Sequence, residues 1–490
     1  MLRPWELKIV IRRSAKTAVF LQIAHAVADE IKRGRLAPGT ALPGSRELAA
    51  SLRINRKTVI QAYAELEAQG WVMSEKQRGT FVASHLPEVE ISNEAPRRKG
   101  HIPERPHFRL IGTAPNIPLI LPKKNVLVFD DGTPDTRHIP VDALARAYRN
   151  ALLRHVARGR LGYGDPRGTV ELRTAISSML NINRGLTTTP DNVCLTRGSQ
   201  MAIYLAARIL AGHGDAVVVE EFSYVPAREA FRHTGAEVVP VPLDAQGMRV
   251  DELEKICRRK RVRAVYVTPH HQFPTTVLMK PDRRLRLLAL AAQFGFAIVE
   301  DDYDHEFHFA HQPMLPLISF EMSGKVVYIG SFSKILSPSL RLGYLVGPKE
   351  FIDRAASEIM MIDRQGDPAT EGAVSELIDS GEMHRHIRKV MKLYEQRREY
   401  FADLLTRSFG DFIEFTLPEG GLAFWVQFKG VDSDRLAAVA ARQGVTILPA
   451  SMFATVPRAF YAARLGFAGM DLPELKRATQ RLRTAYDEAA

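Results

Sequence analysis

The chain has 490 residues, of which 46% are hydrophobic, so wholesale disorder is excluded and a sizeable core can form. Its only two cysteines, Cys194 and Cys257, cannot build a disulfide framework or a paired thiolate metal site, which fits a reducing cytoplasm. No stretch reaches the roughly 18 apolar residues of a membrane span, and the basic N-terminal segment lacks the apolar run of a signal peptide. We therefore expect a cytoplasmic protein with no membrane partner.

The net charge of +12 is unevenly distributed along the chain. Residues 1–85 contain 14 Lys or Arg residues but only 7 Asp or Glu residues, so more than half of the excess lies in the first sixth of the sequence. A compact basic segment attached to a nearly balanced larger one indicates a polyanionic partner for the N-terminal part. A solvated basic surface is the alternative, and charge alone favours that alternative.

Three regions of the chain differ in their sequence pattern. We expect three helices and a short β-wing over residues 14–83, a linker over 84–124, and a large α/β region over 125–490. A smaller C-terminal subdomain is expected from about residue 375. The high proline content of the linker, together with its basic cluster Arg97-Arg98-Lys99, predicts an extended, semi-rigid spacer.

Two short helices are predicted in the N-terminal region. Ser45 is expected to cap the first of them, and Asn55 to cap the second. Arg56, Lys57 and Gln61 fall on the outer face of the second helix, near its start. Apolar residues at helical spacing predict its buried face: Val59, Ala62, Tyr63 and Leu66.

A β-wing is predicted after Gly70, which ends the second helix. Trp71–Ser74 and Thr80–Ala83 would pair, with Arg78-Gly79 at the tip. The order L-P-G-S-R-E-L-A, then N-R-K-T-V-I-Q-A-Y, then a glycine-bounded wing resembles the GntR-type winged helix over about residues 18–83. The resemblance implies binding to promoter DNA through Arg46, Arg56, Lys57, Thr58 and Gly79. A small helical module used only for protein contacts is the alternative.

The large region alternates short apolar runs with amphipathic helices, which predicts a mostly parallel, doubly wound sheet. Ligands of such sheets bind beyond the carboxyl ends of the strands. The expected strands are Val193–Thr196, Ala216–Glu220, Ala236–Val241, Arg263–Thr268, Phe296–Glu300, Val326–Gly330 and Leu342–Val346.

Four segments at these strand ends bear polar groups suited to one ligand. The glycine turn Thr196–Gln200 opens a helix and would present free N–H groups to a phosphate. Glu300–Asp304 places carboxylates and a tyrosine after a strand, and Ser331–Lys334 places a lysine after another, with Arg341 seven residues on. Taken singly, these segments also fit an ordinary turn, a solvated acidic loop or magnesium site, and an exposed lysine.

The ordered set of segments resembles the fold-type I aminotransferases. With the winged helix and the linker, nearly the whole chain is similar to the MocR subfamily of GntR-type regulators. The resemblance implies pyridoxal 5'-phosphate as cofactor, with a Schiff base on Lys334, the pyridine nitrogen facing Asp301 and the phenolic oxygen facing Tyr303. It also implies a phosphate cup made of Ser199, Gln200, Ser331, Ser333 and Arg341.

The resemblance assigns three further residues. Tyr224 would stack on the cofactor ring, although a core aromatic is an equal alternative. Tyr163 would reach the phosphate of the other subunit, since such sites are usually built at the interface of a homodimer. Arg464 would bind the carboxylate of an amino-compound effector in a bidentate fork, the alternative being a surface arginine at a strand edge. No metal is expected in the site.

One stretch departs from the aminotransferase pattern and bears on function. Phe273-Pro274-Thr275-Thr276 stands where these enzymes often have Asn-Pro-x-Gly, and phenylalanine cannot replace the hydrogen bond of the asparagine. We therefore expect a regulator that senses an amino compound or the cofactor itself, without sustained turnover, although a transaminase half-reaction stays open. An active aminotransferase with an accessory DNA-binding module is the alternative.

Overall fold

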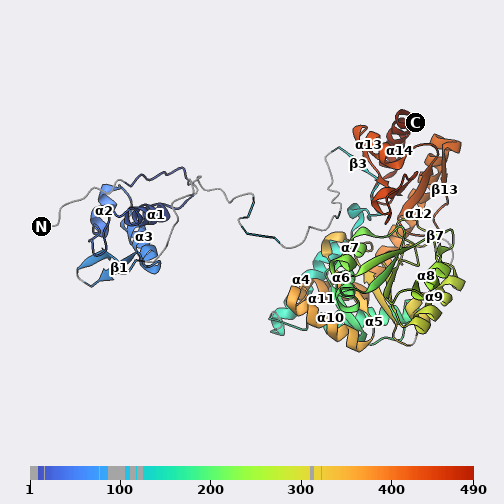
Figure 1. Ribbon diagram of the computed structural model, residues 1–490, viewed down its shortest axis with the longest axis horizontal. Coiled ribbons are helices and arrows are strands. Elements are labelled where there is room, and N and C mark those ends of the chain that lie inside the picture. The colour runs from blue at the N-terminus through green and yellow to red at the C-terminus, as the bar shows by residue number, and fades with distance from the viewer. Residues whose placement is uncertain are drawn as a thin grey trace. The chain divides into compact units, whose positions relative to one another are not determined.

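A computed structural model describes residues 9–15, 17–76, 78–86, 105–106, 108–110, 117, 125–159, 162–309, 314–321 and 323–490. The chain divides into two compact units, residues 1–111 and 112–490 (Figure 1). Most of the expected linker, 84–124, lies outside the described residues. Among the helices of the described residues, none has the length and apolar character that crossing a membrane requires.

The N-terminal unit contains three helices and a two-stranded wing, as the sequence predicts. Helices α1 and α2 pack on α3, and an apolar core that includes Ile23, Leu48 and Leu66 lies between them. The predicted inward face of α3 is buried. The elements are α1 (Val19–Lys32), α2 (Ser45–Ser51), α3 (Arg56–Ala68), β1 (Val72–Glu75) and β2 (Gly79–Val82), and the two strands pair antiparallel.

The two predicted helix caps have different outcomes. Asn55 caps α3, and its side chain accepts a hydrogen bond from the Lys57 amide at 2.8 Å. The prediction for Ser45 is wrong, because Gly44 is the N-cap of α2 and Ser45 is already the first helical residue. The Ser45 hydroxyl accepts a hydrogen bond from Arg56 Nε at 3.2 Å instead, so this side chain joins two helices and caps neither.

Seven strands among the described residues form the main sheet of the second unit, in the order β4-β12-β11-β10-β9-β5-β6. Only β12 runs antiparallel to its neighbours, which confirms the predicted doubly wound α/β class. The strands are β4 (Val193–Thr196), β5 (Ala216–Glu220), β6 (Glu237–Val241), β9 (Val262–Val267), β10 (Ala297–Asp302), β11 (Val326–Ser331) and β12 (Gly343–Val346).

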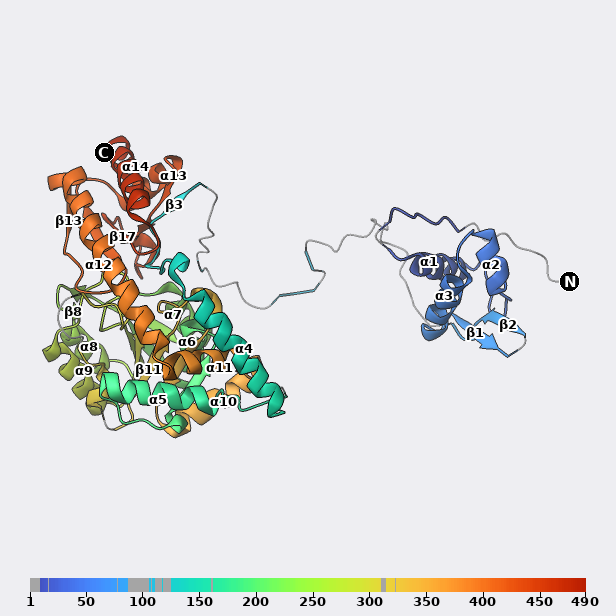
Figure 2. The ribbon, with the colours of Figure 1, turned by 180° about the vertical axis from the view of Figure 1, so that it is seen from behind.

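Helices cover both faces of this sheet (Figures 1 and 2). Successive strand residues alternate between two apolar clusters, as Val217 and Val218 do, because side chains along a strand point to opposite faces. One face packs against α6 (Ser199–Leu210), α7 (Val225–His233) and α10 (Lys349–Ile362). The other packs against α5 (Val170–Arg184), α8 (Val250–Cys257), α9 (Pro281–Phe294) and α11 (Pro368–Asp379), with α4 (Val141–Ala157) lying against α11.

A small subdomain is built around a second sheet, of order β13-β14-β17-β16. The long helix α12 (Glu382–Phe409) contributes to its core and runs from the large sheet toward it (Figure 2). Its other elements are β13 (Ile413–Phe415), β14 (Ala423–Phe428), α13 (Ser433–Arg442), β15 (Val445–Thr446), β16 (Leu448–Pro449), β17 (Ala462–Gly466) and α14 (Leu472–Ala489).

The small subdomain also takes in a segment from the other end of the unit. Strand β3 (Leu127–Val128) pairs parallel with β15, although more than 300 residues separate them. The amide of Phe129 donates to the Thr446 carbonyl at 2.9 Å, and the Phe129 ring stacks on Phe401 at 5.2 Å. The sequence pattern did not predict this pairing, because a two-residue strand carries no periodicity.

Candidate functional site

The ends of β4, β11 and β10, with the start of β12 between β4 and β11, bring the predicted segments together. Gly343, the first residue of β12, pairs with Thr196 of β4 on one side and with Ser331 of β11 on the other. Asp302 of β10 pairs with Gly330. The turn after β4, the loop after β11 and the acidic end of β10 therefore share one edge of the sheet, as expected for a ligand site in this fold class.

The start of α6 forms a close-packed cradle with Arg341. Gly198 is the N-cap of this helix at a φ of +77°, and a Cβ added there would lie 3.0 Å from the Arg341 guanidinium. Arg341 donates to the Arg197 carbonyl at 2.8 Å. A Cβ on Gly343 would lie 2.9 Å from the Ser199 amide nitrogen. Because free N–H groups and a positive helix end meet a guanidinium here, the cradle suits an anion such as phosphate.

The other predicted cup residues lie beside this cradle. Gln200 is the second residue of α6, and its buried Oε1 has no hydrogen-bond partner among the described atoms. Ser331 ends β11, and its hydroxyl accepts a hydrogen bond from the Ser333 amide at 3.1 Å. These polar groups lie on the strands and helix that flank Arg341, so the predicted set is gathered in one place.

Asp301 presents an unsatisfied carboxylate oxygen at the end of β10. Its side chain is buried, its Oδ2 accepts a hydrogen bond from the Tyr266 hydroxyl at 2.6 Å, and its Oδ1 has no partner among the described atoms. Burial raises the pKa of Asp301 to about 7, an effect that the Tyr266 hydrogen bond only partly opposes. A buried oxygen without a donor fits a ligand that brings one, as a protonated pyridine nitrogen does.

This raised pKa predicts a pH-dependent stability for the cofactor-free protein. An unfolded aspartate titrates near pH 3.9, so as the pH rises from about 4 to about 7 the unfolded chain releases a proton that folded Asp301 keeps, and stability is lost. Asp301→Asn cannot ionise and should escape that loss. We expect the variant to gain roughly 2–3 kcal/mol over the wild type between about pH 5 and pH 8, measured by urea unfolding.

The comparison isolates Asp301, because other buried acids occur in both proteins. Burial also raises the pKa values of Glu220 and Glu300 to about 7, and their contributions cancel in the difference. A stability difference that stays constant across this pH range would contradict the assignment. In the cofactor-bound protein the gain should shrink, because a pyridinium partner stabilises ionised Asp301.

Aromatic side chains form a box around Phe273. Tyr224, Tyr303 and Phe453 each meet the Phe273 ring edge-to-face, at centroid distances of 5.3, 5.9 and 5.3 Å. The Tyr303 hydroxyl donates to the His271 carbonyl at 3.0 Å. Tyr224 is the N-cap of α7, is only partly buried, and lines a cavity.

Lys334 and Arg464 meet at a residue that the sequence analysis missed. Lys334 Nζ lies 3.4 Å from Asp131 Oδ1, and Arg464 Nε donates to the Asp131 carbonyl at 3.0 Å. Burial alone would raise the pKa of Asp131, but the charges of Lys334 and Arg464 outweigh it and hold the pKa below its usual range. The turn Asp130-Asp131-Gly132 after an apolar run was the available signal.

Arg464 is a buried residue and not a surface arginine, since only 1% of it is exposed. Its Nη1 donates to the Pro274 carbonyl at 2.7 Å, and its guanidinium lies 4.6 Å from the centroid of the Phe273 ring. The bidentate role predicted for Arg464 therefore depends on Nη2 and the second hydrogen of Nη1.

A cavity of about 750 Å³ lies beside Asp131, Tyr224 and Phe273. Lys334, Asp301 and Arg464 are not among the described residues that line it. Its wall joins the small subdomain to the large sheet, and its volume is that of an ordinary small-molecule site. The lining contains both acidic and apolar side chains. They include Asp130, Asp131, Asp135, Tyr224, Val225, Phe273, Leu448, Met452 and Phe453.

Tyr163 does not reach the cavity from its own chain. It is 82% exposed, and the Arg364 guanidinium lies 4.8 Å from its ring centroid. Neighbouring Gly164 donates its amide to the Gln365 side chain. Its predicted role needs a second subunit.

The predicted DNA-contacting residues belong to α2, α3 and the wing of the first unit. Arg46, Arg56, Lys57 and Gly79 are exposed, and Thr58 is partly buried. Gly79 starts β2 at a φ of +118°, a conformation that favours glycine, and the neighbouring Arg78 pairs with Glu75 at 2.6 Å. The start of α3 therefore presents two basic side chains, Arg56 and Lys57, to solvent.

The chain matches two known families. Residues 124–482 match the family described as "Aminotransferase class I and II", and residues 20–82 match "Bacterial regulatory proteins, gntR family". It is 29% identical over 481 residues to the probable rhizopine catabolism regulatory protein MocR of Rhizobium meliloti, covering 98% of this chain and 96% of that protein. It is 30% identical to the HTH-type transcriptional regulator TauR of Rhodobacter capsulatus, covering 88% and 89% of the two chains.

Solved structures resemble the second unit. The multiple substrate aminotransferase of Thermococcus profundus superimposes with a TM-score of 0.70 and 29% identity, over 75% of this chain and 92% of that one. LysN, the alpha-aminoadipate aminotransferase of Thermus thermophilus complexed with N-(5'-phosphopyridoxyl)-L-leucine, gives 0.69 and 28%, over 75% and 93%. The chain therefore belongs to the class I and II aminotransferase family and, with its N-terminal gntR-family unit, is a MocR-type transcriptional regulator that carries an aminotransferase-like domain.

Proposed function

We propose that this regulator binds promoter DNA through its first unit and senses an amino compound, or pyridoxal 5'-phosphate itself, through its second. The observation that carries the proposal is the unpartnered, buried Asp301 Oδ1, which lies on the same sheet edge as an anion cradle and a lysine. The cofactor needs an acceptor for its ring nitrogen, a phosphate site and an amine, and this arrangement supplies all of them.

Each predicted residue takes a specific part in holding the cofactor. Lys334 would provide the amine, and Asp301 would accept a hydrogen bond from the ring nitrogen. Tyr303 would turn its single O–H from the His271 carbonyl to the phenolic oxygen. Tyr224 would cover one ring face. When bound, the cofactor would supply an electrophilic aldehyde to which an amino compound can attach. The phosphate would lie in the cup formed by Ser199, Gln200, Ser331, Ser333 and Arg341.

Two features support a homodimer as the functional form. Helix α4 exposes Tyr148, Leu153 and Val156 along one side, and a groove of about 540 Å³ runs beside it. Such an apolar face on a surface helix is suited to burial against a second copy. In the dimer, exposed Tyr163 would be available to the partner's site.

The site favours sensing over sustained turnover. The ring of Phe273 packs against Tyr224 and Tyr303, so an apolar edge occupies the place from which an asparagine would donate a hydrogen bond. Without that donor, electron density at the phenolic oxygen is less well controlled. An active aminotransferase remains the second candidate, because the Lys334 and Asp301 pattern is that of the enzymes. We place the protein in the reducing cytoplasm, where buried Cys194 and Cys257 stay free thiols.

The proposal is tested by titrating purified full-length protein with a panel of amino compounds while following the cofactor's visible spectrum and promoter binding together. An effector should change both signals, and operator DNA should change effector affinity by the same factor as the effector changes DNA affinity. Steady production of keto acid at ordinary enzyme rates would establish the enzyme instead. Promoter binding that ignores both cofactor and effector would leave the second unit without a regulatory role.

Arg464→Ala should separate cofactor binding from effector binding. Arg464 contacts backbone carbonyls and the Phe273 ring, and its remaining donors are the ones available to an effector carboxylate. We expect the variant to keep the cofactor spectrum while its affinity for a carboxylated effector falls by about 2–5 kcal/mol, measured by spectral titration. An amine without a carboxylate serves as the control ligand, and its affinity should change little. Equal losses for both ligands would refute the anchor.

A further inference from the structure

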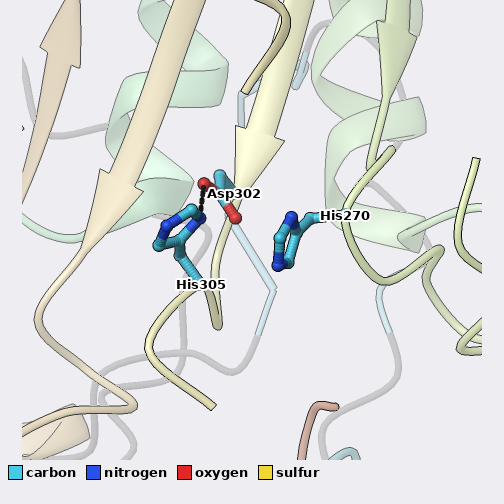
Figure 3. A group of neighbouring side chains, drawn as sticks. All are labelled: His270, Asp302 and His305. Atoms are coloured by element: carbon cyan, nitrogen blue, oxygen red, sulfur yellow. Dashed lines mark ion pairs between the residues drawn. The ribbon is translucent and has the colours of Figure 1, made fainter. Parts of the chain in front are cut away.

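Three side chains outside the cofactor site form a compact buried group, drawn in Figure 3. His270 follows β9, Asp302 ends β10, and His305 comes three residues later. All are buried, with exposed fractions of 5, 4 and 6%. One potential ligand atom from each lies within 4.8 Å of the others. Two imidazoles and a carboxylate are the side chains that zinc and similar divalent transition metals prefer.

The polar atoms of this group lack the hydrogen bonds that burial normally requires. Among the described atoms, His270 Nδ1 and Asp302 Oδ1 have no hydrogen-bond partner. His305 Nδ1 lies 2.8 Å from Asp302 Oδ2 and forms an ion pair with it (Figure 3). Buried polar atoms normally have a partner, and a cation shared by the three side chains would supply one to His270 and Asp302.

The contacts of Asp302 with its neighbours are made by Oδ2. This oxygen accepts a hydrogen bond from the Tyr328 hydroxyl at 2.7 Å and lies 3.7 Å from Arg184, which also pairs with Glu306. Arg284 donates to the carbonyls of Leu315 and Pro269. Asp302 Oδ1 therefore has no partner among the described atoms and is the oxygen that a cation could bind.

A route to the group exists from outside. His270 lines a cavity of about 610 Å³, whose other lining residues include Thr276, Glu419 and Trp425. The residues predicted to bind the cofactor do not line this cavity. An ion can therefore reach the imidazole of His270 without unfolding the sheet, and water from the cavity can complete its coordination.

We propose that His270, Asp302 and His305 form a binding site for a divalent transition metal, zinc in the first instance. The site adds to the sensing role and does not depend on it. Asp302 adjoins Asp301 in β10, and Gly420 and Gly421 of the small subdomain pack tightly on His271 and Asp304 nearby, where added Cβ atoms would lie 2.2 and 2.9 Å away. Occupancy would stiffen the junction between this strand end and the small subdomain.

The test uses full-length protein stripped with a chelator and then dialysed against Zn²⁺. One tightly bound equivalent per chain is expected by elemental analysis, and Co²⁺ should give a ligand-field absorption in its place. His270→Ala and His305→Ala should each weaken binding by more than about 100-fold. Zinc should raise the melting temperature of the wild type and leave that of either variant unchanged.

His308→Ala is the matched control. His308 lines the same cavity and its ring contacts the His305 carbonyl at 3.3 Å, but it lies outside the group of ligand atoms. The His308→Ala variant should still bind one equivalent of Zn²⁺ per chain as tightly as the wild type. A stripped wild type that takes up no equivalent of Zn²⁺ or Co²⁺ would overturn the proposal. So would a His270→Ala/His305→Ala double variant, shown folded by circular dichroism, that binds as tightly as the wild type.

Discussion

Lys334→Ala is expected to abolish the borohydride-reducible link between protein and cofactor. Lys334 is the lysine that follows β11 and lies 3.4 Å from Asp131, beside the cavity that Tyr224 and Phe273 line. With no amine at this position, covalent attachment cannot occur, whatever affinity the phosphate cup retains. Reduction with borohydride followed by mass measurement should show the cofactor mass on the wild type and none on the variant. Promoter binding should then stop responding to amino compounds.

The control is Lys280→Ala, which removes an exposed lysine from the rim of the other cavity. This variant should keep both the covalent link and the response to effector. If borohydride still attaches the cofactor to Lys334→Ala at full yield, another amine of the protein binds the cofactor. That result would contradict the assignment of Lys334.

Arg56→Ala and Lys57→Ala should weaken promoter binding in different ways. Both side chains are exposed at the start of α3, and Ser45 orients Arg56 through the 3.2 Å hydrogen bond to its Nε. Loss of a base contact from Arg56 should cost roughly 1–3 kcal/mol and relax specificity at one base pair. Loss of a phosphate contact from Lys57 should reduce affinity on all sequences and lower the salt slope by about one. Fluorescence anisotropy at several salt concentrations measures both effects.

Arg33→Ala provides the matched control, since it removes the same charge from the end of α1, where Arg33 pairs with Glu30 at 3.8 Å. The affinity of the Arg33→Ala variant for the promoter, and the dependence of that affinity on salt, should stay close to those of the wild type. If the Arg56→Ala/Lys57→Ala double variant binds with unchanged affinity and unchanged salt dependence, α3 is not the recognition helix.

The sequence alone was sufficient to predict those parts of the site whose functional side chains lie within a short run of residues. The segments around Ser199, Asp301 and Lys334 each follow a predicted strand, and parallel strands bring their carboxyl ends to one edge. The order of these motifs along the chain is therefore enough to predict that the three segments meet at one edge of the sheet. The winged helix was predictable for the same reason, because its caps, buried face and glycine turn fall within about seventy residues.

Long-range pairing was not predictable. Asp131 meets Lys334 across 203 positions, and its place depends on β3 joining a strand of the small subdomain. His270 lies in the loop after β9 and Asp302 ends β10, so no spacing within one element signals their approach. Ser45 shows a smaller failure: its residue type fits a cap, but the chain enters the helix one residue earlier, at Gly44.

Strand β3 ties the start of the second unit to the small subdomain. Backbone hydrogen bonds from Leu127 and Phe129 to Gly444 and Thr446, together with the stacked ring of Phe401, attach this segment to it. The small subdomain is therefore discontinuous in sequence. A C-terminal fragment that begins after Phe129 would lack a strand and a fully buried core residue of this subdomain.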